Sequence, residues 1–540
     1  MKNIERLNIR QEITQREEEG CEIGDLGSRI DAAIKDNATA DLVTLYDELD
    51  GLEPAESFAY EEPSTLEEIK ALRPDGPRRM EISISDEDLY DRIHGAWLGR
   101  AAGCSLGKPV EGWPRERIDE YLESKNALPL DDYVPYDEKQ IGHGLKTSTR
   151  NNIEFMERDD DMDYPILGLI ALEQRAEKFS PRAMANVWMN HMPVNLLYTA
   201  ERAAYRNFVV GYWPPESATY RNPHREWIGA QIRADMFGYV APGWPEKAAK
   251  LAFQDASISH VKNGIYGEMF VAAMLAAAYV SDDIVEIINV GLSEIPANCR
   301  LSEAIHDTLG WCQELNDWEA VWDKIKERYG HYSGVHTINN AALVVLGLYF
   351  GNTNYEDGIV ISVRGGWDTD CNGATVGSIL GLKFGAAALP EKWIGVLNDR
   401  LRSSVREFNE NKISELAERT VTIAKQIMAL TDEEPEEEPD TASGEPSDSP
   451  FVGNWVIDKS FARWDISVKA NLTGTFEDGT GYSCKLHNVK AEGKNVAFDF
   501  VMDKGGFGID IQFEGKVDSD KLNGVGMGNG FEMPIEAERA

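Results

Sequence analysis

The chain has 540 residues, of which 42% are hydrophobic, and 93 acidic against 54 basic residues give it a formal net charge of −39. At roughly 100–200 residues per domain, this length predicts two to four domains with room for a sizeable core. Nucleic acid and anionic membranes repel so acidic a protein, so direct binding to either is disfavoured. Its carboxylates could hold a metal cation, although most of them must be solvated surface.

Targeting signals and cysteines narrow the expected location. The first twenty residues, MKNIERLNIRQEITQREEEG, lack the apolar segment of a secretory signal. No window of about 18 uncharged apolar residues occurs, so no membrane span is expected. The six cysteines contain no C-x-x-C pair, which argues against a zinc ribbon and against a disulfide framework. We therefore expect a cytoplasmic protein.

Residues 1–85 are predicted to form a helical, acidic extension. The segment SRIDAAIKDNATADLVTLYDELD at residues 28–50 has helical character, and the Pro-rich stretch RPDGPRR follows at residues 73–79. Two alternatives remain open for this extension: a short lead-in domain, or an arm that packs against the core.

Residues 86–430 are predicted to form an all-α domain. Three stretches rich in Ala, Leu, Gly and Met are expected to be buried helices, and they cover residues 267–280, 339–350 and 374–388. In the third stretch, Gly377, Gly381 and Gly385 recur every four residues on one helix face, where bare backbone lets another helix approach closely. No β-branched strands alternate with these helices, which disfavours a doubly wound sheet.

A linker and a small β domain are predicted after residue 430. Residues 431–450 contain nine acidic residues, four prolines and no basic residue. Such a segment cannot bury enough apolar surface to offset its ordering entropy, so we expect an extended tether. Residues 451–540 contain short apolar segments separated by Gly-rich turns, which predicts an antiparallel barrel or sandwich. This β domain is a candidate for binding a protein or a ligand, and the sequence does not say which.

Two segments imitate known site signatures. Residues 103–107 match the G-x-S-x-G nucleophile pattern, which needs a strand before it and a helix after it. Here a helical segment precedes the motif and Lys108-Pro109 follows it, so we expect a turn of small residues. Residues 368–373 begin like an EF-hand loop, but Ile379 stands where the loop needs its bidentate Glu.

Two groups of aspartates lie far apart in the chain, each just before a predicted helix. The first is Asp159-Asp160-Asp161 and the second contains Asp368 and Asp370. Each group could simply cap its helix, where the helix dipole stabilises an acid by roughly 0.3–1 kcal/mol. If the groups instead converge, their repulsion requires cations, and oxygen ligands favour Mg²⁺ or Mn²⁺ over zinc. Such a site suits two ions roughly 3.5–4 Å apart.

Four segments, in chain order, resemble motifs of the ADP-ribosylglycohydrolase family. They are RIHGAWLGRAAGCSLGKPVEGW at 92–113, RDDDMDYPILGLIALE at 158–173, ISHVKNGIYGEMFVAAM at 258–274 and GGWDTDCNGATVGS at 365–378. The resemblance covers about residues 86–430 and implies an all-α fold with two Mg²⁺ ions in a cleft.

The resemblance also implies roles for individual residues. Asp160 and Asp161 match one metal-binding pair, and Asp368 and Asp370 match the other. Asp159 stands where many members have a Thr or Ser ligand. Departures from the family pattern fall on two cysteines, because Cys371 stands where a Thr ligand is usual and Cys104 where many members have Asp. Glu111 matches the acidic residue that closes the first motif, and we expect it to act as general base because it need not be a permanent metal ligand. The residues that match the loop expected beside the substrate ribose are His260, Asn263, Gly264 and Tyr266. The Gly-rich turn of Gly365 and Gly366 is available to bind the diphosphate.

The implied activity is Mg²⁺-dependent cleavage of an ADP-ribosyl C1″ bond, which releases ADP-ribose from a modified protein or small molecule. Two alternatives stay open. The chain could hydrolyse another N- or O-ribosyl compound, because the motifs say little about the leaving group. It could also be a non-catalytic module that binds ADP-ribose, which the two cysteine departures favour.

Overall fold

The computed structural model describes residues 3–430, 451–459, 462–469, 474–478, 483–492, 494–504, 507–528 and 531–539. The chain divides into two compact units, Met1–Ala429 and Leu430–Ala540, and each is described by itself. The predicted tether at residues 431–450 lies outside the described residues.

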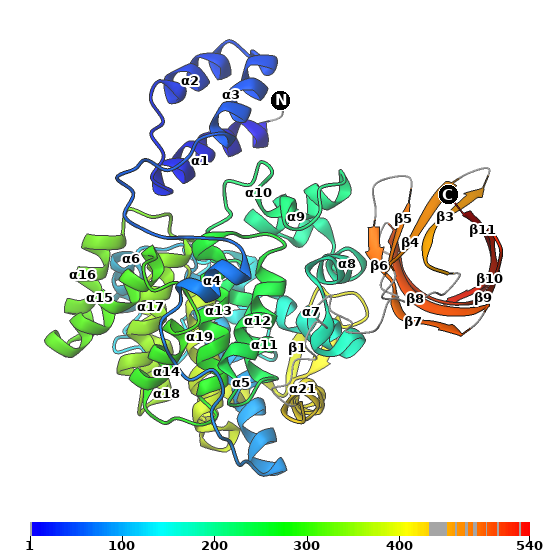
Figure 1. Cartoon of the computed structure of the whole chain (residues 1–540). Coiled ribbons are helices and arrows are strands. Elements are labelled where there is room, and N and C mark those ends of the chain that lie inside the picture. Colours follow the sequence, from blue (N-terminus) through cyan, green and yellow to red (C-terminus); the bar gives the residue numbers. More distant parts are fainter. Residues whose placement is uncertain are drawn as a thin grey trace. The chain divides into compact units, whose positions relative to one another are not determined.

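Helices make up nearly all of the first unit, so the predicted all-α core is confirmed, with one short hairpin added (Figure 1). The hairpin pairs β1 (Arg400–Arg402) with β2 (Glu410–Lys412). The α-helices are α1 (Asn3–Glu18), α2 (Leu26–Lys35), α3 (Thr39–Asp50), α4 (Leu66–Leu72), α5 (Asp86–Gly107), α6 (Arg115–Ser124), α7 (Asp160–Arg175), α8 (Pro181–His191), α9 (Thr199–Val209), α10 (Glu216–Thr219), α11 (Asp235–Tyr239), α12 (Pro245–Ala256), α13 (Lys262–Ala277), α14 (Ile284–Leu292), α15 (Arg300–Leu315), α16 (Trp318–Tyr329), α17 (Thr337–Phe350), α18 (Tyr355–Arg364), α19 (Thr369–Phe384), α20 (Glu391–Ile394) and α21 (Ile413–Met428). Short 3-10 helices are η1 (Lys108–Val110), η2 (His143–Ser148), η3 (Ala176–Lys178), η4 (Val194–Leu196), η5 (Gln231–Arg233), η6 (Ala386–Ala388) and η7 (Gly395–Leu397).

Helices α5 and α19 pack against each other through glycines. A Cβ atom added to Gly99 would lie 2.1 Å from the Gly377 carbonyl oxygen, and one added to Gly377 would lie 2.2 Å from the Gly99 oxygen. The same reciprocal exclusion joins Gly95 to Gly381 and Gly103 to Gly373. The helices run antiparallel, and the Thr369 hydroxyl donates to the Gly107 carbonyl across 2.8 Å. This contact brings the end of α5 beside the start of α19.

Two sequence expectations need correction here. Gly377 and Gly381 meet a neighbouring helix as expected, but Gly385 has φ +80° and ends α19 at Phe384, before the predicted 388. Residues 103–107 form the last turn of α5 and not a loop, because the preceding helical residues continue through the small side chains that pack on α19.

Residues 1–85 pack against the helical core. Arg225 lies between two carboxylates of the extension, donating to Glu12 in α1 at 2.9 Å and to Glu19 just after α1 at 2.9 Å. Arg300 at the start of α15 pairs with Glu62 at 2.7 Å and with Glu226 at 2.8 Å. All six side chains are buried. Helices α1–α3 also share a small apolar cluster of their own: Ile9, Leu26, Ile30, Ala33, Leu42, Leu45, Tyr46 and Leu49.

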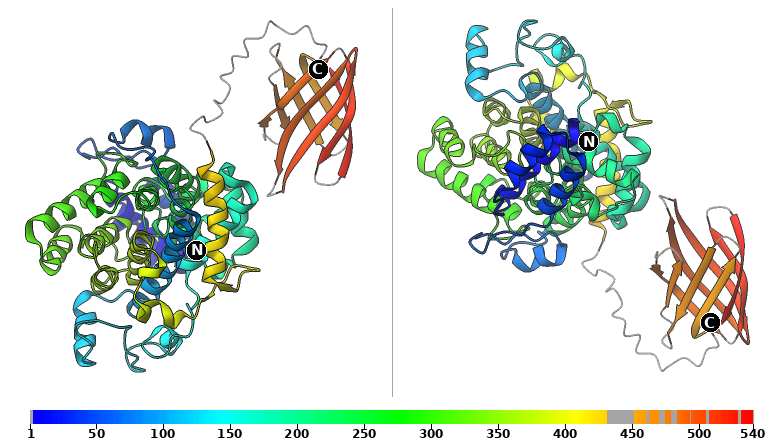
Figure 2. Two further views of the ribbon diagram at one scale, coloured as in Figure 1. Left: turned by 90° about the horizontal axis from the view of Figure 1, so that it is seen from below. Right: turned by 90° about the horizontal axis from the view of Figure 1, so that it is seen from above.

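The second unit is one curved antiparallel sheet, so the predicted small β domain is confirmed (Figure 2). Its strand order is β6-β5-β4-β3-β11-β10-β9-β8-β7. Among the residues buried inside the sheet are Phe451, Trp455, Phe476, Phe498 and Phe513. The strands are β3 (Gly453–Lys459), β4 (Ala462–Val468), β5 (Gly474–Asp478), β6 (Ser483–Lys485), β7 (His487–Glu492), β8 (Asn495–Lys504), β9 (Phe507–Asp518), β10 (Lys521–Gly528) and β11 (Phe531–Arg539). Within the described residues, we find no helix that combines the length and the hydrophobicity of a membrane span.

Candidate active site

The first aspartate group begins α7. Asp159 occupies the N-cap position with extended backbone, and its carboxylate accepts a hydrogen bond from the Asp161 backbone N–H at 3.1 Å. One acid therefore does cap the helix, as the simpler interpretation of the sequence predicts. The carboxylates of Asp160 and Asp161 take no part in this capping.

The second group begins α19, where the backbone is sharply constrained. Gly366 has φ +78° and Trp367 has φ +61°. A Cβ atom on Gly366 would lie 2.8 Å from the Trp113 carbonyl oxygen. The segment is fixed by two backbone hydrogen bonds, from Gly112 to Trp367 at 2.9 Å and from Trp367 to Trp113 at 3.2 Å. This pairing places Glu111 beside Asp368.

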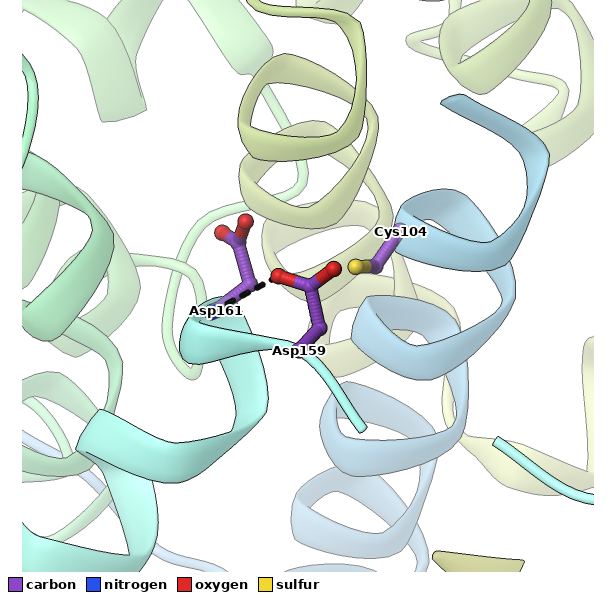
Figure 3. A group of neighbouring side chains, drawn as sticks. All are labelled: Cys104, Asp159 and Asp161. Carbon is purple, nitrogen blue, oxygen red and sulfur yellow. Dashed lines mark hydrogen bonds between the residues drawn. The ribbon is translucent and has the colours of Figure 1, made fainter. Parts of the chain in front are cut away.

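The two aspartate groups come together at the junction of α5, α7 and α19. Three sets of side chains each offer ligand atoms within 4.8 Å of one another. Figure 3 shows the first set, in which Cys104 from α5 faces the carboxylates of Asp159 and Asp161. The three sets are Cys104, Asp159 and Asp161; Asp161, Asp370 and Cys371; and Glu111, Asp368 and Asp370. We call these seven residues the carboxylate cluster.

Burial and mutual repulsion shift the acids of this cluster. Burial raises the pKa of Asp370 well above its usual range, and the charges of Glu111 and Asp159 raise it further. Burial likewise raises the pKa of Asp161, although Arg100 opposes the effect. The Glu111 side chain reaches solvent, but the protein packed around its base and the charge of Asp368 raise its pKa to about 7.

The donor atoms fit a divalent cation. One carboxylate oxygen each of Asp368 and Asp370 is buried without a hydrogen-bond partner, which is costly unless a cation occupies the space beside it. Carboxylate oxygens are the ligands of Mg²⁺ and Mn²⁺. The two cysteines of the cluster differ from these carboxylates in charge. Burial raises the pKa of the Cys371 and Cys104 thiols well above the ordinary value and keeps both thiols neutral.

Asp160 lies at the margin of the carboxylate cluster. Burial raises its pKa well above the usual range, and Asp159 adds to the effect. It belongs to none of the three close sets among the described residues. Its assignment as a metal ligand therefore stays a prediction.

The predicted ribose-binding residues bond to other parts of their own chain. The His260 ring lies 2.8 Å from the Ser259 hydroxyl, and Asn263 donates to Glu226 at 2.7 Å. The Tyr266 hydroxyl donates to the Pro63 carbonyl of the N-terminal extension. Gly264 packs against the Arg225 backbone oxygen, where a Cβ atom would lie 2.6 Å away. Their role in substrate binding stays a prediction.

The two glycines predicted at the diphosphate also have partners within the chain. The Gly365 carbonyl accepts a hydrogen bond from the Trp322 indole at 2.8 Å, and Gly366 makes the tight turn against Trp113 described above. In this structure both glycines set the position of Asp368. Binding of a diphosphate there stays a prediction.

Three cations next to the carboxylate cluster escaped the sequence analysis. Arg100 is fully buried in α5 and donates to Asp161 at 3.1 Å and to Asp235 at 2.7 Å. Arg158 pairs with Asp163 at 2.8 Å. Lys108 pairs with Asp159. The sequence did contain a signal for these cations, because all three lie inside motifs that supply residues of the carboxylate cluster.

Comparisons with known proteins identify the family of the chain. The model of the ADP-ribosylglycohydrolase family matches residues 85–430, more than half of the chain. The chain therefore belongs to the ADP-ribosylglycohydrolase family, as its motifs predicted. A protein of Archaeoglobus fulgidus described as uncharacterized is 24% identical over 345 residues, which cover 62% of this chain and 99% of that protein. A solved structure described as an ADP-ribosylglycohydrolase-related protein complex is 17% identical, covers 63% of this chain and 100% of its own, and has a TM-score of 0.42.

Proposed function

We propose that this protein is a Mg²⁺-dependent glycohydrolase that cleaves an ADP-ribosyl C1″ bond and releases ADP-ribose from a modified protein or small molecule. The observation that carries the proposal is the meeting of Asp161, Asp368 and Asp370 from distant segments in a member of this family. Two of these acids keep buried oxygens without partners. Mn²⁺ is an alternative ion for the same oxygen ligands.

The chain's own residues suggest a division of labour. Asp161, Asp368 and Asp370 would hold the cation. When bound, such an ion supplies stabilisation of developing negative charge and orientation of the ribose hydroxyls. Glu111 is the solvent-accessible member of its set, so its carboxylate can meet a water molecule and the substrate from outside.

Glu111 is the proposed general base. The water oxygen forms a bond to C1″ while the bond from C1″ to the leaving atom breaks, through a transition state that resembles an oxocarbenium ion. Glu111 takes the proton that the water loses, and the leaving atom accepts a proton from solvent. A carboxyl group with a pKa of about 7 can accept a proton near neutral pH.

The proposal is tested by single isosteric substitutions. Asp370→Asn removes a buried carboxylate charge and is expected to lower Mg²⁺-dependent ADP-ribose release by about 100-fold or more. Glu111→Gln is expected to lower the rate by about 100-fold to 10,000-fold while ADP-ribose binding persists. The assay uses Arg-linked, Ser-linked and nucleic-acid-linked ADP-ribose, because the leaving group is part of the question.

A matched control comes from another N-cap aspartate. Asp317 caps α16 by accepting a hydrogen bond from the Glu319 backbone N–H at 3.0 Å, and it lies outside the carboxylate cluster. Asp317→Asn keeps a capping side chain and should leave the rate unchanged. Wild-type turnover by the Asp370→Asn protein would show that the proposed cation site is wrong.

A second candidate function rests on the two cysteines. Cys104 and Cys371 place neutral thiols within 4.8 Å of the acids that would hold a cation, and sulfur is a poor ligand for Mg²⁺. A site weakened in this way would bind ADP-ribose without hydrolysing it. Binding of ADP-ribose at saturating Mg²⁺, with no product from any of the three substrates, would favour this alternative.

A further inference from the structure

A lysine occupies one side of the carboxylate cluster. Lys108 is the first residue of η1, directly after α5, and its side chain is only 13% exposed. Its ammonium group donates to the Asp159 carboxylate and, at 2.6 Å, to the Arg158 carbonyl oxygen. Two partners from the segment before α7 therefore hold the ammonium in place. Although burial opposes its charge, Asp159 raises the pKa of Lys108, so the group stays protonated.

The cations next to the cluster are distributed unevenly over its three sets. In the set of Cys104, Asp159 and Asp161, each carboxylate already pairs with a cation, Lys108 for Asp159 and Arg100 for Asp161. This set contains no uncompensated acid, because its third member is a neutral thiol.

The set of Glu111, Asp368 and Asp370 has no such direct ion pair, and Lys108 acts on it only from a greater distance. Among the described residues, neither Glu111 nor Asp368 nor Asp370 forms an ion pair with a lysine or arginine. The unpartnered buried oxygens belong to Asp368 and Asp370 and not to Asp159 or Asp161. Negative charge without a partner is therefore concentrated at Glu111, Asp368 and Asp370.

We propose that the Lys108 ammonium takes the place of one of the two divalent cations expected at such a cluster. The chain then binds a single divalent ion, held by Asp368 and Asp370 together with Asp161. A second divalent ion at Asp159 would have to displace an ammonium group that has two fixed partners, and it would meet the thiol of Cys104 in place of an oxygen ligand. This inference rests on the proposed function only in requiring that the cluster binds a divalent cation.

The test counts Mn²⁺ ions bound to the full-length chain. Isothermal titration calorimetry gives the stoichiometry, and electron paramagnetic resonance tells an isolated Mn²⁺ from a coupled pair. We expect one ion per wild-type chain, with the spectrum of an isolated ion. Lys108→Met removes the charge but keeps a long side chain, and it should raise the count to two, with the signature of a coupled pair.

Lys125 supplies the matched control, because its ammonium also pairs with an aspartate, Asp137, but outside the cluster. Lys125→Met should still bind one ion. A folded Lys108→Met protein that binds one ion would overturn the role of Lys108. If that variant does not fold, the wild-type measurement still decides, because two coupled ions in the wild-type chain refute the proposal directly.

Failure of this inference can be told from failure of the proposed function. Two ions in the wild-type chain, together with metal-dependent release of ADP-ribose, would refute the role of Lys108 alone. No Mn²⁺ binding at all by the wild-type chain would refute both the single-ion site and the metal-dependent activity.

Discussion

Substituting one glycine in α5 tests the helix contact that brings the residues of the carboxylate cluster together. Gly99→Ala places a methyl group 2.1 Å from the Gly377 carbonyl oxygen, whereas ordinary contacts begin at 3.4 Å. The helices must therefore separate by about 1.3 Å (3.4 − 2.1) at this point. Both sides of the contact are backbone, so no side chain can rotate away to relieve it.

The expected loss of stability follows from two opposing effects. Forcing an extra methyl into a packed core costs about 1–3 kcal/mol. Because the added methyl at Gly99 meets backbone atoms of α19, we expect a cost at the upper end of this range. Replacing glycine by alanine within a helix favours the folded state by about 0.8–1.0 kcal/mol. We therefore expect a net destabilisation of about 2 kcal/mol. Because Asp368 directly precedes α19 and Asp370 lies in its first turn, Mn²⁺ binding should weaken as well.

Gly310 provides the matched control within the same unit. It lies on α15 with nothing within 4 Å of the position of its added Cβ. Gly310→Ala should raise stability by about 0.4–1 kcal/mol. Urea unfolding followed by the helical circular dichroism signal measures both variants, and calorimetry measures their Mn²⁺ affinity. If Gly99→Ala stabilises the protein as much as Gly310→Ala does, the close contact of α5 with α19 is refuted.

Two further predictions concern the N-terminal extension. Burial, with the charge of Glu226, raises the pKa of Glu18 from 4.5 to about 7, so the contribution of Glu18 to the docking of α1 is fully present below about pH 4.5 and is lost as pH rises through about 7. Glu18→Gln should remove this dependence and protect α1 amides from hydrogen exchange at about pH 8 by about 3 kcal/mol more than the wild type. Equal pH dependence in both proteins would contradict the prediction. Arg225→Met leaves Glu12 and Glu19 without their buried cation. This loss should lower the free energy of unfolding by about 3–5 kcal/mol and expose the extension to limited proteolysis. Unchanged protection of residues 1–60 would refute the ion-pair contribution.

The sequence predicted the helices of the core better than it predicted which helices pack against each other. Glycines every four residues in 374–388 correctly indicated a close helix neighbour, because spacing alone defines a helix face. The neighbour itself, α5, could not be identified, because its matching glycines Gly95, Gly99 and Gly103 gain meaning only when the helices run antiparallel. The family motifs and the small β domain were predicted correctly.

The chemistry of the candidate site was less accessible from the sequence. Repulsion within Asp159-Asp160-Asp161 suggested a shared pocket, but spacing cannot say which acid caps the helix and which faces Asp370. In the sequence, Lys108 only follows the G-x-S-x-G pattern of residues 103–107. Its ion pair with Asp159 becomes visible in the fold, which brings η1 next to the start of α7. Long-range pairings between single charged side chains leave no periodic pattern in a sequence.

The N-terminal extension has a practical consequence for anyone who expresses this protein. Sequence similarity to the family begins at residue 85, yet Arg225 and Arg300 find their acidic counterparts at Glu12, Glu19 and Glu62. A gene fragment that begins at residue 85 would encode a protein in which Arg225 and Arg300 lack these carboxylate partners. The shortest fragment worth cloning therefore starts before the first helix.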